Sequence, residues 1–290
     1  MEKEVNFAVI GDCHYSAKEN YSTRDCLGAK KRLVSIVNTL NECDLDFVFS
    51  LGDLGDGHDI GEVPEILDVF AGCKHIVKYA IGNHDLCRRT EVEHAEIVNM
   101  PAPMYDFSVN GFRFIVLNAF EISRYSRDEK EREAYWNFRK SNPDTPVQEW
   151  PGLFRESSWK LLEDMLDDAS SKGEDVVILC HVPVLGLSCL RELGETEPLA
   201  RLVEHEKMLA LLDKYTNVRA YIAGHYHPGG LSVRNGVVHK TVRSICDFKE
   251  ETYCLVTLDG ESLKIRGRGM ESNFAYSYQK TDIKNVKTQY

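Results

Sequence analysis

The sequence contains five short motifs, between residues 11 and 227, whose side chains are typical metal ligands. Each combines aspartate, asparagine or histidine with a neighbouring glycine or cysteine. The motifs are Gly11-Asp12-Cys13-His14, Gly52-Asp53, Gly82-Asn83-His84-Asp85, Cys180-His181 and Gly224-His225-Tyr226-His227. Carboxylate oxygens and imidazole nitrogens suit divalent transition metals, and two adjacent ions can activate a water and clamp the oxygens of a phosphoryl group. The ligand set therefore predicts a dinuclear metal site for phosphoryl chemistry.

Asp53 is expected to lie between the two ions, because its carboxylate can lend one oxygen to each. Asp12 and His14 would bind the first ion together with one of two downstream histidines. Asn83 and His181 would bind the second ion together with the other. The downstream pair is spaced so that both imidazoles lie on one side of an extended segment. The seven predicted ligands are Asp12, His14, Asp53, Asn83, His181, His225 and His227.

His84 is predicted to be a proton donor instead of a ligand, although it directly follows Asn83. Asp85 stands beside it and is expected to hold one ring nitrogen, which would fix the tautomer and raise the basicity of the imidazole. A histidine placed there could protonate a leaving oxygen while water attacks phosphorus. His84 and Asp85 are therefore the predicted catalytic residues.

Other polar side chains are divided between substrate contacts and structural roles. Arg24, Arg191 and Arg243 are candidates for binding substrate phosphate. The stretch from Asp56 to Asp59 follows Asp53 and is interpreted as a solvated turn. Four further histidines lack the context of a strand followed by glycine and are interpreted as structural. They are His75, His94, His205 and His239.

Short apolar runs before the motifs predict buried strands that deliver the ligands from their carboxyl ends. Helical periodicity between these runs gives strand–helix–strand alternation, which is typical of an α/β fold with right-handed crossovers. The expected strands are Val5–Ile10, Phe47–Leu51, His75–Ile81, Val176–Cys180 and Val218–Ala223. The expected helices include Arg24–Leu40, Val63–Phe70 and Leu199–Tyr215.

The motif spread predicts a single domain over residues 1–270, because ligands from Asp12 to His227 must meet. Residues 119–157 break the alternation and are expected to be a functional insertion, whose aromatic side chains could stack on a base. Ser157 is expected to cap a helix that runs to Ala169. Short alternating strands after Gly224 predict antiparallel sheet, followed by a loosely packed tail over residues 271–290.

The composition limits the kinds of binding partner and of cellular compartment that we expect. The net charge of −11 argues against a dedicated nucleic-acid binder, although two cations would still attract a small anionic substrate. Nine cysteines, an odd number without any Cys-x-x-Cys pair, favour a reducing compartment. The chain also lacks a bilayer-length apolar stretch and a basic leader, so we expect a cytoplasmic protein without membrane contacts. The sequence leaves the oligomeric state open.

Taken together, the five motifs resemble those of the calcineurin-like metallophosphoesterase superfamily over residues 5 to about 268. The resemblance implies a four-layer αββα sandwich, in which two mixed β-sheets are flanked by helices. It also implies that His84 is the proton donor and that the ligands are divided in a defined way. One ion would be held by Asp12, His14, Asp53 and His227, and the other by Asp53, Asn83, His181 and His225.

Segments between the motifs resemble the manganese-dependent ADP-ribose/CDP-alcohol diphosphatase family. Residues 105–108, 111–119 and 265–269 carry this similarity. It implies hydrolysis of the diphosphate linkage in small nucleoside diphosphate conjugates, such as ADP-ribose or CDP-alcohols. Manganese is favoured by the resemblance, while iron or zinc also suit the ligands. Some members carry glutamine where this chain has His14, which leaves metal preference and substrate selectivity open.

Two alternatives remain from the sequence. A cyclic-nucleotide or general phosphodiesterase could be built on the same core and the same ligands. A protein of another class, a non-catalytic scaffold, could keep the fold after losing its metals. Such scaffolds lack ligands or the proton-donor histidine, whereas every ligand position and His84 are present here.

Overall fold

The protein was analysed as a computed structural model that describes residues 3–21, 24–143, 149–185 and 200–278. Its first sheet consists of β1 (Val5–Ile10), β2 (Phe47–Ser50), β3 (Val77–Tyr79), β10 (Tyr253–Leu258), β11 (Ser262–Arg268) and β12 (Phe274–Ser277). The strands lie in the order β12-β11-β10-β1-β2-β3. β1, β2 and β3 run parallel, whereas β10 pairs antiparallel with both β1 and β11. The sheet is therefore mixed.

The second sheet consists of β4 (Tyr105–Val109), β5 (Phe112–Leu117), β6 (Asp175–Cys180), β7 (Val218–Ala223), β8 (Gly230–Arg234) and β9 (Val237–Thr241). Its order is β4-β5-β6-β7-β9-β8. The central strands from β5 to β9 pair in parallel, and β4 and β8 close the two edges antiparallel. The expected antiparallel strands after Gly224 are thus divided between the two sheets.

Aromatic side chains join the facing sides of the two sheets. Phe7 of β1 stacks on Phe47 of β2. Both rings make T-shaped contacts with Phe114 from β5, with centroid distances of 5.3 Å for Phe7 and 4.9 Å for Phe47. All three rings are buried. Interlocking aromatic pairs of this kind add to the free energy of apolar burial and fix the sheets against each other.

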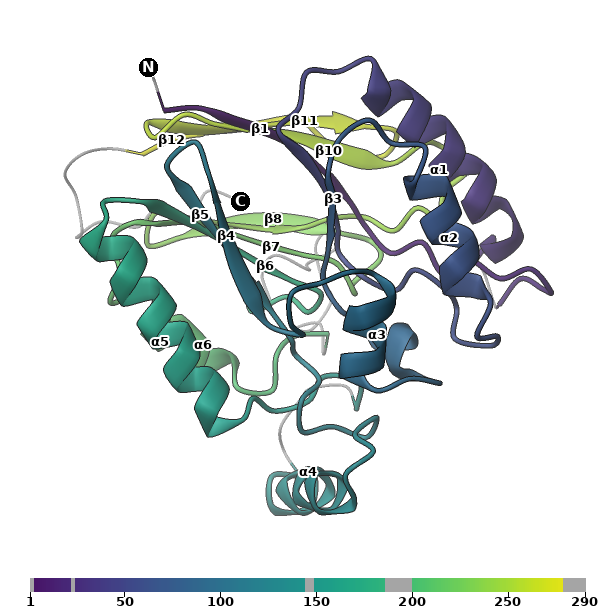
Figure 1. The fold of residues 1–290 in the computed structure, drawn as a ribbon. Helices are drawn as coiled ribbons and strands as arrows, with labels where there is room; N and C mark the ends of the chain where they lie inside the picture. Colours follow the sequence, from purple (N-terminus) through teal and green to yellow (C-terminus); the bar gives the residue numbers. More distant parts are fainter. Residues whose placement is uncertain (1–2, 22–23, 144–148, 186–199, 279–290) are drawn as a thin grey trace.

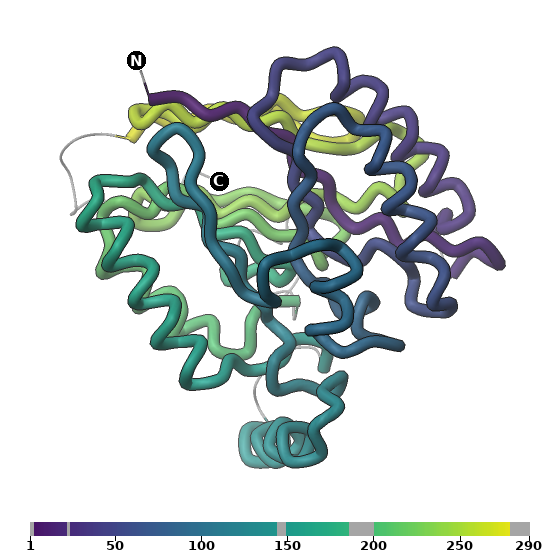
Figure 2. The backbone as a smooth tube through the Cα atoms, in the orientation of Figure 1, coloured from purple at the N-terminus to yellow at the C-terminus, as the bar shows by residue number. Residues whose placement is uncertain are grey.

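Helices cover the outer sides of the two sheets (Figures 1 and 2). α1 (Cys26–Asn41) and α2 (Glu62–Phe70) pack together beside the first sheet, while α5 (Glu156–Ser171) packs on β5 and β6 of the second, with α6 (His205–Leu212) next to it. This arrangement confirms the predicted α/β four-layer sandwich. Among the described residues, every helix is too short or too polar to traverse a bilayer.

Three local expectations differ from the structure. Residues 119–157 contain a helix, α4 (Glu129–Ser141), that the broken alternation did not predict. Ser157 lies inside the first turn of α5, and Arg155 occupies the cap position without a side-chain cap bond. The expected loosely packed tail, residues 271–290, contains β12, which pairs with β11 and so belongs to the first sheet. Residues 279–290 lie outside the described part of the chain.

Candidate metal centre

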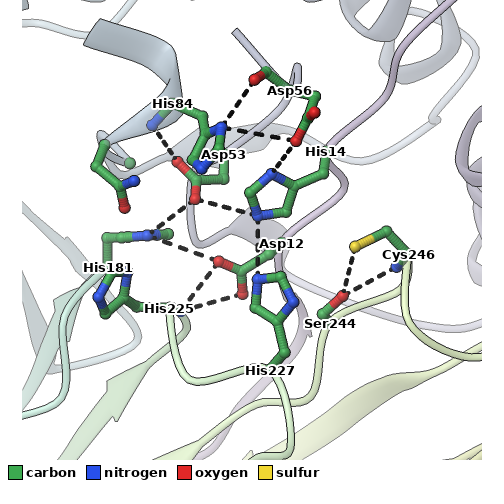
Figure 3. A network of polar contacts seen from close by, with 12 residues as sticks. Asp12, His14, Asp53, Asp56, His84, His181, His225, His227, Ser244 and Cys246 are labelled. Carbon is green, nitrogen blue, oxygen red and sulfur yellow. Dashed lines mark hydrogen bonds and ion pairs between the residues drawn. The ribbon is translucent and has the colours of Figure 1, made fainter. Parts of the chain in front are cut away.

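The strands and turns bring the five motifs together at one edge of the sandwich (Figure 3). Because the carboxyl ends of parallel strands share an edge, loops far apart in sequence open onto the same place. Four clusters have potential ligand atoms within 4.8 Å of one another, and three of them consist of motif residues alone. They are Asp12 with His14 and His227, Asp53 with His181 and His225, and His14 with Asp53 and His84.

Asp53 lies between the two ligand clusters. Its Oδ2 is 3.3 Å from His14 Nε2 and also 3.3 Å from His181 Nε2. Its Oδ1 accepts a hydrogen bond of 2.8 Å from the backbone N–H of His84. One oxygen of Asp53 therefore faces both clusters, which is consistent with a carboxylate shared by two ions.

The backbone around Asp53 requires glycine at two positions, Gly52 and Gly82. Gly52 has a φ of 98° and Asp53 a φ of 51°, so the chain turns through the left-handed region directly after β2. A side chain on Gly82 would collide with the Asp53 carboxylate. The glycines of the motifs thus allow two metal loops to approach each other closely.

Three ligand histidines are anchored through Nδ1 by an acceptor behind them. A donated Nδ1–H leaves Nε2 with its lone pair free for a cation. The anchored pairs are His14 with the Asp56 carboxylate (3.0 Å), His181 with the Leu51 carbonyl (2.8 Å) and His227 with the Asp247 carboxylate (2.7 Å). The surroundings therefore select the tautomer that a metal site requires.

Buried ligand atoms without partners show that the residues fit a pair of cations. Asn83 Oδ1, His181 Nε2 and His225 Nε2 are buried and have no hydrogen-bond partner among the described residues. His14 Nε2 lies 3.0 Å from His227 Nε2, so two nitrogen lone pairs face each other when both Nδ1 atoms carry hydrogen. Unpaired buried acceptors are costly, and divalent cations would satisfy them.

Burial and charge act in opposite directions on the ligand pKa values. Burial lowers the pKa of His181, but the Asp53 and Asp12 carboxylates outweigh it and raise this pKa to about 9. Burial would raise the pKa of Asp53, yet the surrounding imidazoles, His181 foremost, hold it well below its usual range. The carboxylates around His181 therefore favour positive charge at this position, which a bound cation would also supply.

The expected partner of His84 is wrong. His84 Nδ1 lies 2.8 Å from the Asp56 carbonyl and 3.6 Å from the Asp56 carboxylate. Asp85 instead accepts hydrogen bonds from the backbone N–H groups of Asp53, Leu54 and Gly82. The interpretation of a solvated turn is also wrong for Asp56, whose side chain is 1% exposed.

Sequence reasoning missed both carboxylates that anchor ligand histidines. Asp56 lies in a run of aspartate, glycine and histidine that carries no signal to single it out. Asp247 follows β9 in a loop whose backbone is bonded to the site, since Ser244 N–H donates to the His227 carbonyl and Ile245 N–H to the Asp12 carbonyl. Asp247 can therefore be recognised as an anchor only from the three-dimensional position of this loop.

The three arginine candidates have different surroundings. The Arg24 guanidinium lies 3.4 Å from the Asp56 carboxylate and 3.4 Å from His14 Nδ1, at the border of the metal cluster. The Arg243 guanidinium lies over the Phe248 ring, with 5.8 Å to the centroid. Arg191 lies outside the described residues.

The segment over residues 119–157 borders the cluster with aromatic rings. Phe120 is 5.8 Å from the His181 ring, and Tyr125 is 6.2 Å from Phe120. Trp150 is exposed and lies under the Arg124 guanidinium, 4.9 Å from its ring centroid. The expected functional insertion is thus adjacent to the predicted metal ligands.

A cluster of this composition at the strand ends of a two-sheet α/β sandwich defines a class of two-metal phosphoesterases. The Calcineurin-like phosphoesterase family model matches residues 5–229, and the chain belongs to this family. Family membership, together with a ligand set that meets in space, makes the protein a metal-dependent hydrolase and removes the support for a non-catalytic scaffold.

The chain is also similar to curated relatives that share one name. The chain is 26% identical over 280 residues to a manganese-dependent ADP-ribose/CDP-alcohol diphosphatase of Oryza sativa subsp. japonica, covering 84% of both chains. It is 24% identical over 328 residues to the Danio rerio protein of the same name, covering 96% of this chain and 100% of that one. A solved dimetal phosphatase from Danio rerio has the same fold, with a TM-score of 0.83, 21% identity and coverage of 96% and 100%.

Proposed function

We propose that this protein is a dinuclear metal-dependent diphosphatase that cleaves the phosphoanhydride bond of small nucleoside diphosphate conjugates. ADP-ribose and CDP-alcohols are the leading substrates, since these are the substrates in the names of the curated relatives. One observation carries the proposal: the other six predicted ligand side chains gather around Asp53, and several of their buried acceptor atoms have no partner among the described residues.

The ligands divide into two sets that share Asp53. Asp12, His14 and His227 form one set with it, and Asn83, His181 and His225 form the other. Manganese is the proposed native ion, from the names of the relatives, and iron or zinc would suit the same donors. When bound, two such ions supply an activated water and neutralise charge that develops on the phosphoryl oxygens.

His84 is the proposed proton donor. Its Nδ1–H donates to the Asp56 carbonyl at 2.8 Å, which fixes the ring, so that the Nε2–H of the imidazolium form is the proton that can be transferred. As water attacks phosphorus and the bridging P–O bond breaks, this proton passes to the leaving phosphate oxygen. The side chain is 23% exposed, so a substrate can reach it.

Substrate phosphate is proposed to contact Arg24, which borders the cluster. Its guanidinium is 24% exposed and is held at 3.4 Å from the Asp56 carboxylate, so it can turn a further N–H toward an anion. Arg243 and Arg191 remain candidates from the sequence for the same role. Tyr125, from the segment over residues 119–157, is a candidate for a contact with the nucleoside.

The direct test compares substrates and metals in parallel. ADP-ribose, CDP-glycerol and a cyclic nucleotide are incubated with the protein loaded with Mn²⁺, Mg²⁺ or Zn²⁺. We expect the highest kcat/KM for a diphosphate conjugate with Mn²⁺. A higher value for the cyclic nucleotide would favour the phosphodiesterase alternative, and no turnover of any phosphorus ester would overturn the proposal.

His84→Ala separates proton donation from metal binding. The variant is expected to retain both ions and to lose about 100-fold or more of its activity on ADP-ribose, whose leaving group needs a proton. An activated aryl phosphodiester, whose leaving group needs none, should lose far less. Equal losses on both substrates would exclude His84 as the donor. His75→Ala is the matched control, because this histidine contacts the Leu40 carbonyl before β3, at the opposite end of that strand from the site.

A further inference from the structure

A buried carboxylate lies directly behind the metal ligands. The Asp85 side chain is in η1 (His84–Leu86), one residue after the proposed proton donor, and is almost fully buried. Its Oδ2 accepts hydrogen bonds from Asp53 N–H and from Gly82 N–H, both at 2.9 Å. Its Oδ1 accepts a third from Leu54 N–H at 3.0 Å. Charge-assisted bonds from three amides are the strong kind of side chain–backbone contact.

The three amides belong to the two loops that face each other across the cluster. Asp53 and Leu54 follow β2, whereas Gly82 precedes Asn83 and His84 after β3. The Asp53 backbone adopts a φ of 51°, a conformation that an aspartate occupies only when its surroundings determine it. Asp85 accepts the amide of this same residue, so it stabilises the turn that presents the shared ligand.

We propose that Asp85 is a positioning residue that locks the Asp53 loop to the Asn83–His84 loop before any ion binds. Its effect passes through Asp53, whose Oδ1 also accepts the His84 N–H at 2.8 Å. The carboxylate thereby fixes the shared ligand and the proposed proton donor relative to each other. This inference rests on the proposed dinuclear centre.

The chemistry of the contact requires a carboxylate and not an amide. Both oxygens of Asp85 are acceptors, and amide N–H groups approach them from two sides. An asparagine offers one oxygen, and its NH₂ group would face an N–H. The neighbouring His94 does not replace the lost acceptor, since its Nε2 is 3.7 Å from Oδ2 and burial lowers its pKa, which keeps the ring neutral.

The test measures the metal pair without substrate. In the wild-type protein loaded with Mn²⁺, electron paramagnetic resonance should show two exchange-coupled ions, because both proposed ligand sets include Asp53. Asp85→Asn should bind the second ion about 10–100-fold more weakly and show the spectrum of isolated ions. The same variant should lose kcat while the KM for ADP-ribose changes little.

Asp259→Asn is the matched control. Asp259 accepts the backbone N–H groups of Glu261 and Ser262 in the turn between β10 and β11, far from the ligands in the fold. This variant can lower the melting temperature, but it should keep the coupled spectrum and the second-ion affinity. An Asp85→Asn protein that matched it in both respects would overturn the inference. A wild type with no manganese pair would overturn the proposed centre and, with it, this role of Asp85.

Amide hydrogen exchange in the unaltered, metal-free protein tests the same point if Asp85→Asn does not fold. The amides of Asp53, Leu54 and Gly82 should be protected before manganese is added, because Asp85 already accepts them. Protection that arises only with manganese would show that the ions order the loops, and Asp85 would have no positioning role.

Discussion

The protein buries two groups of histidines equally well and uses them differently. His14 and His181 in the metal cluster are 1% and 0% exposed, and His94 and His239 elsewhere are 0% and 2% exposed. The first two hold Nδ1 against an acceptor and turn Nε2 toward Asp53. The other two have ring nitrogens without a hydrogen-bond partner among the described residues. Burial alone therefore does not identify a ligand histidine.

Nearby charge distinguishes His181 from His239. Burial lowers the pKa of both His181 and His239, but the carboxylates of Asp53 and Asp12 reverse the outcome for His181 and raise it to about 9. His239 lies near Arg234, which adds to the effect of burial, and its pKa falls to about 3. The carboxylates around His181 thus favour positive charge at that ring, whereas the surroundings of His239 keep its ring neutral.

The largest effect is expected from removing the Asp53 carboxylate, which both proposed ligand sets share. Asp53→Asn is expected to abolish binding of the ion pair and to reduce kcat/KM by more than the 10–100-fold that is usual for partners outside the ligand set. Metal content after dialysis and turnover of ADP-ribose measure the two effects. Retention of two ions with near-normal turnover would remove Asp53 from the centre of the site.

A smaller effect is expected from the carboxylate that anchors His227. Asp247 Oδ2 lies 2.7 Å from His227 Nδ1, so Asp247→Asn should weaken manganese binding and kcat/KM by about 10–100-fold. Asp213→Asn is a suitable control, because Asp213 forms an ion pair with Arg234, outside the metal cluster. Equal manganese affinities in the two variants, by calorimetry, would mean that the anchor does not tune the ligand.

A third prediction concerns the structural histidine His239 and is confined to acidic pH. The pKa of His239 is lowered from 6.5 to about 3 in the folded protein, so the unfolded chain takes up this proton first as pH falls. The stabilisation is complete above pH 6.5 and is lost progressively toward pH 3, at up to about 1.4 kcal/mol per pH unit. In His239→Phe the free energy of unfolding should fall less steeply over this window, measured by denaturant titration. A slope equal to that of the wild type would place the folded pKa near its ordinary value.

The sequence by itself determined the candidate ligands and the architecture that brings them together. Apolar runs predicted the strands, and polar residues directly after them had to meet, because the carboxyl ends of parallel strands share an edge. His14, Asn83 and His225 were selected as candidates in this way, since residue type and position at a strand end are both local properties. The aromatic contacts between the two sheets then follow from ordinary apolar burial.

Only the tertiary structure decided which groups support those ligands. Asp56 and Asp247 anchor histidines that are 42 and 20 residues away in sequence, and such pairs leave no periodic pattern. Asp85 was expected beside the His84 ring, yet the turn of η1 directs its carboxylate to the amides of Asp53, Leu54 and Gly82. The physical reason is that side-chain direction in a loop depends on backbone torsions, which long-range hydrogen bonds fix and local residue type does not.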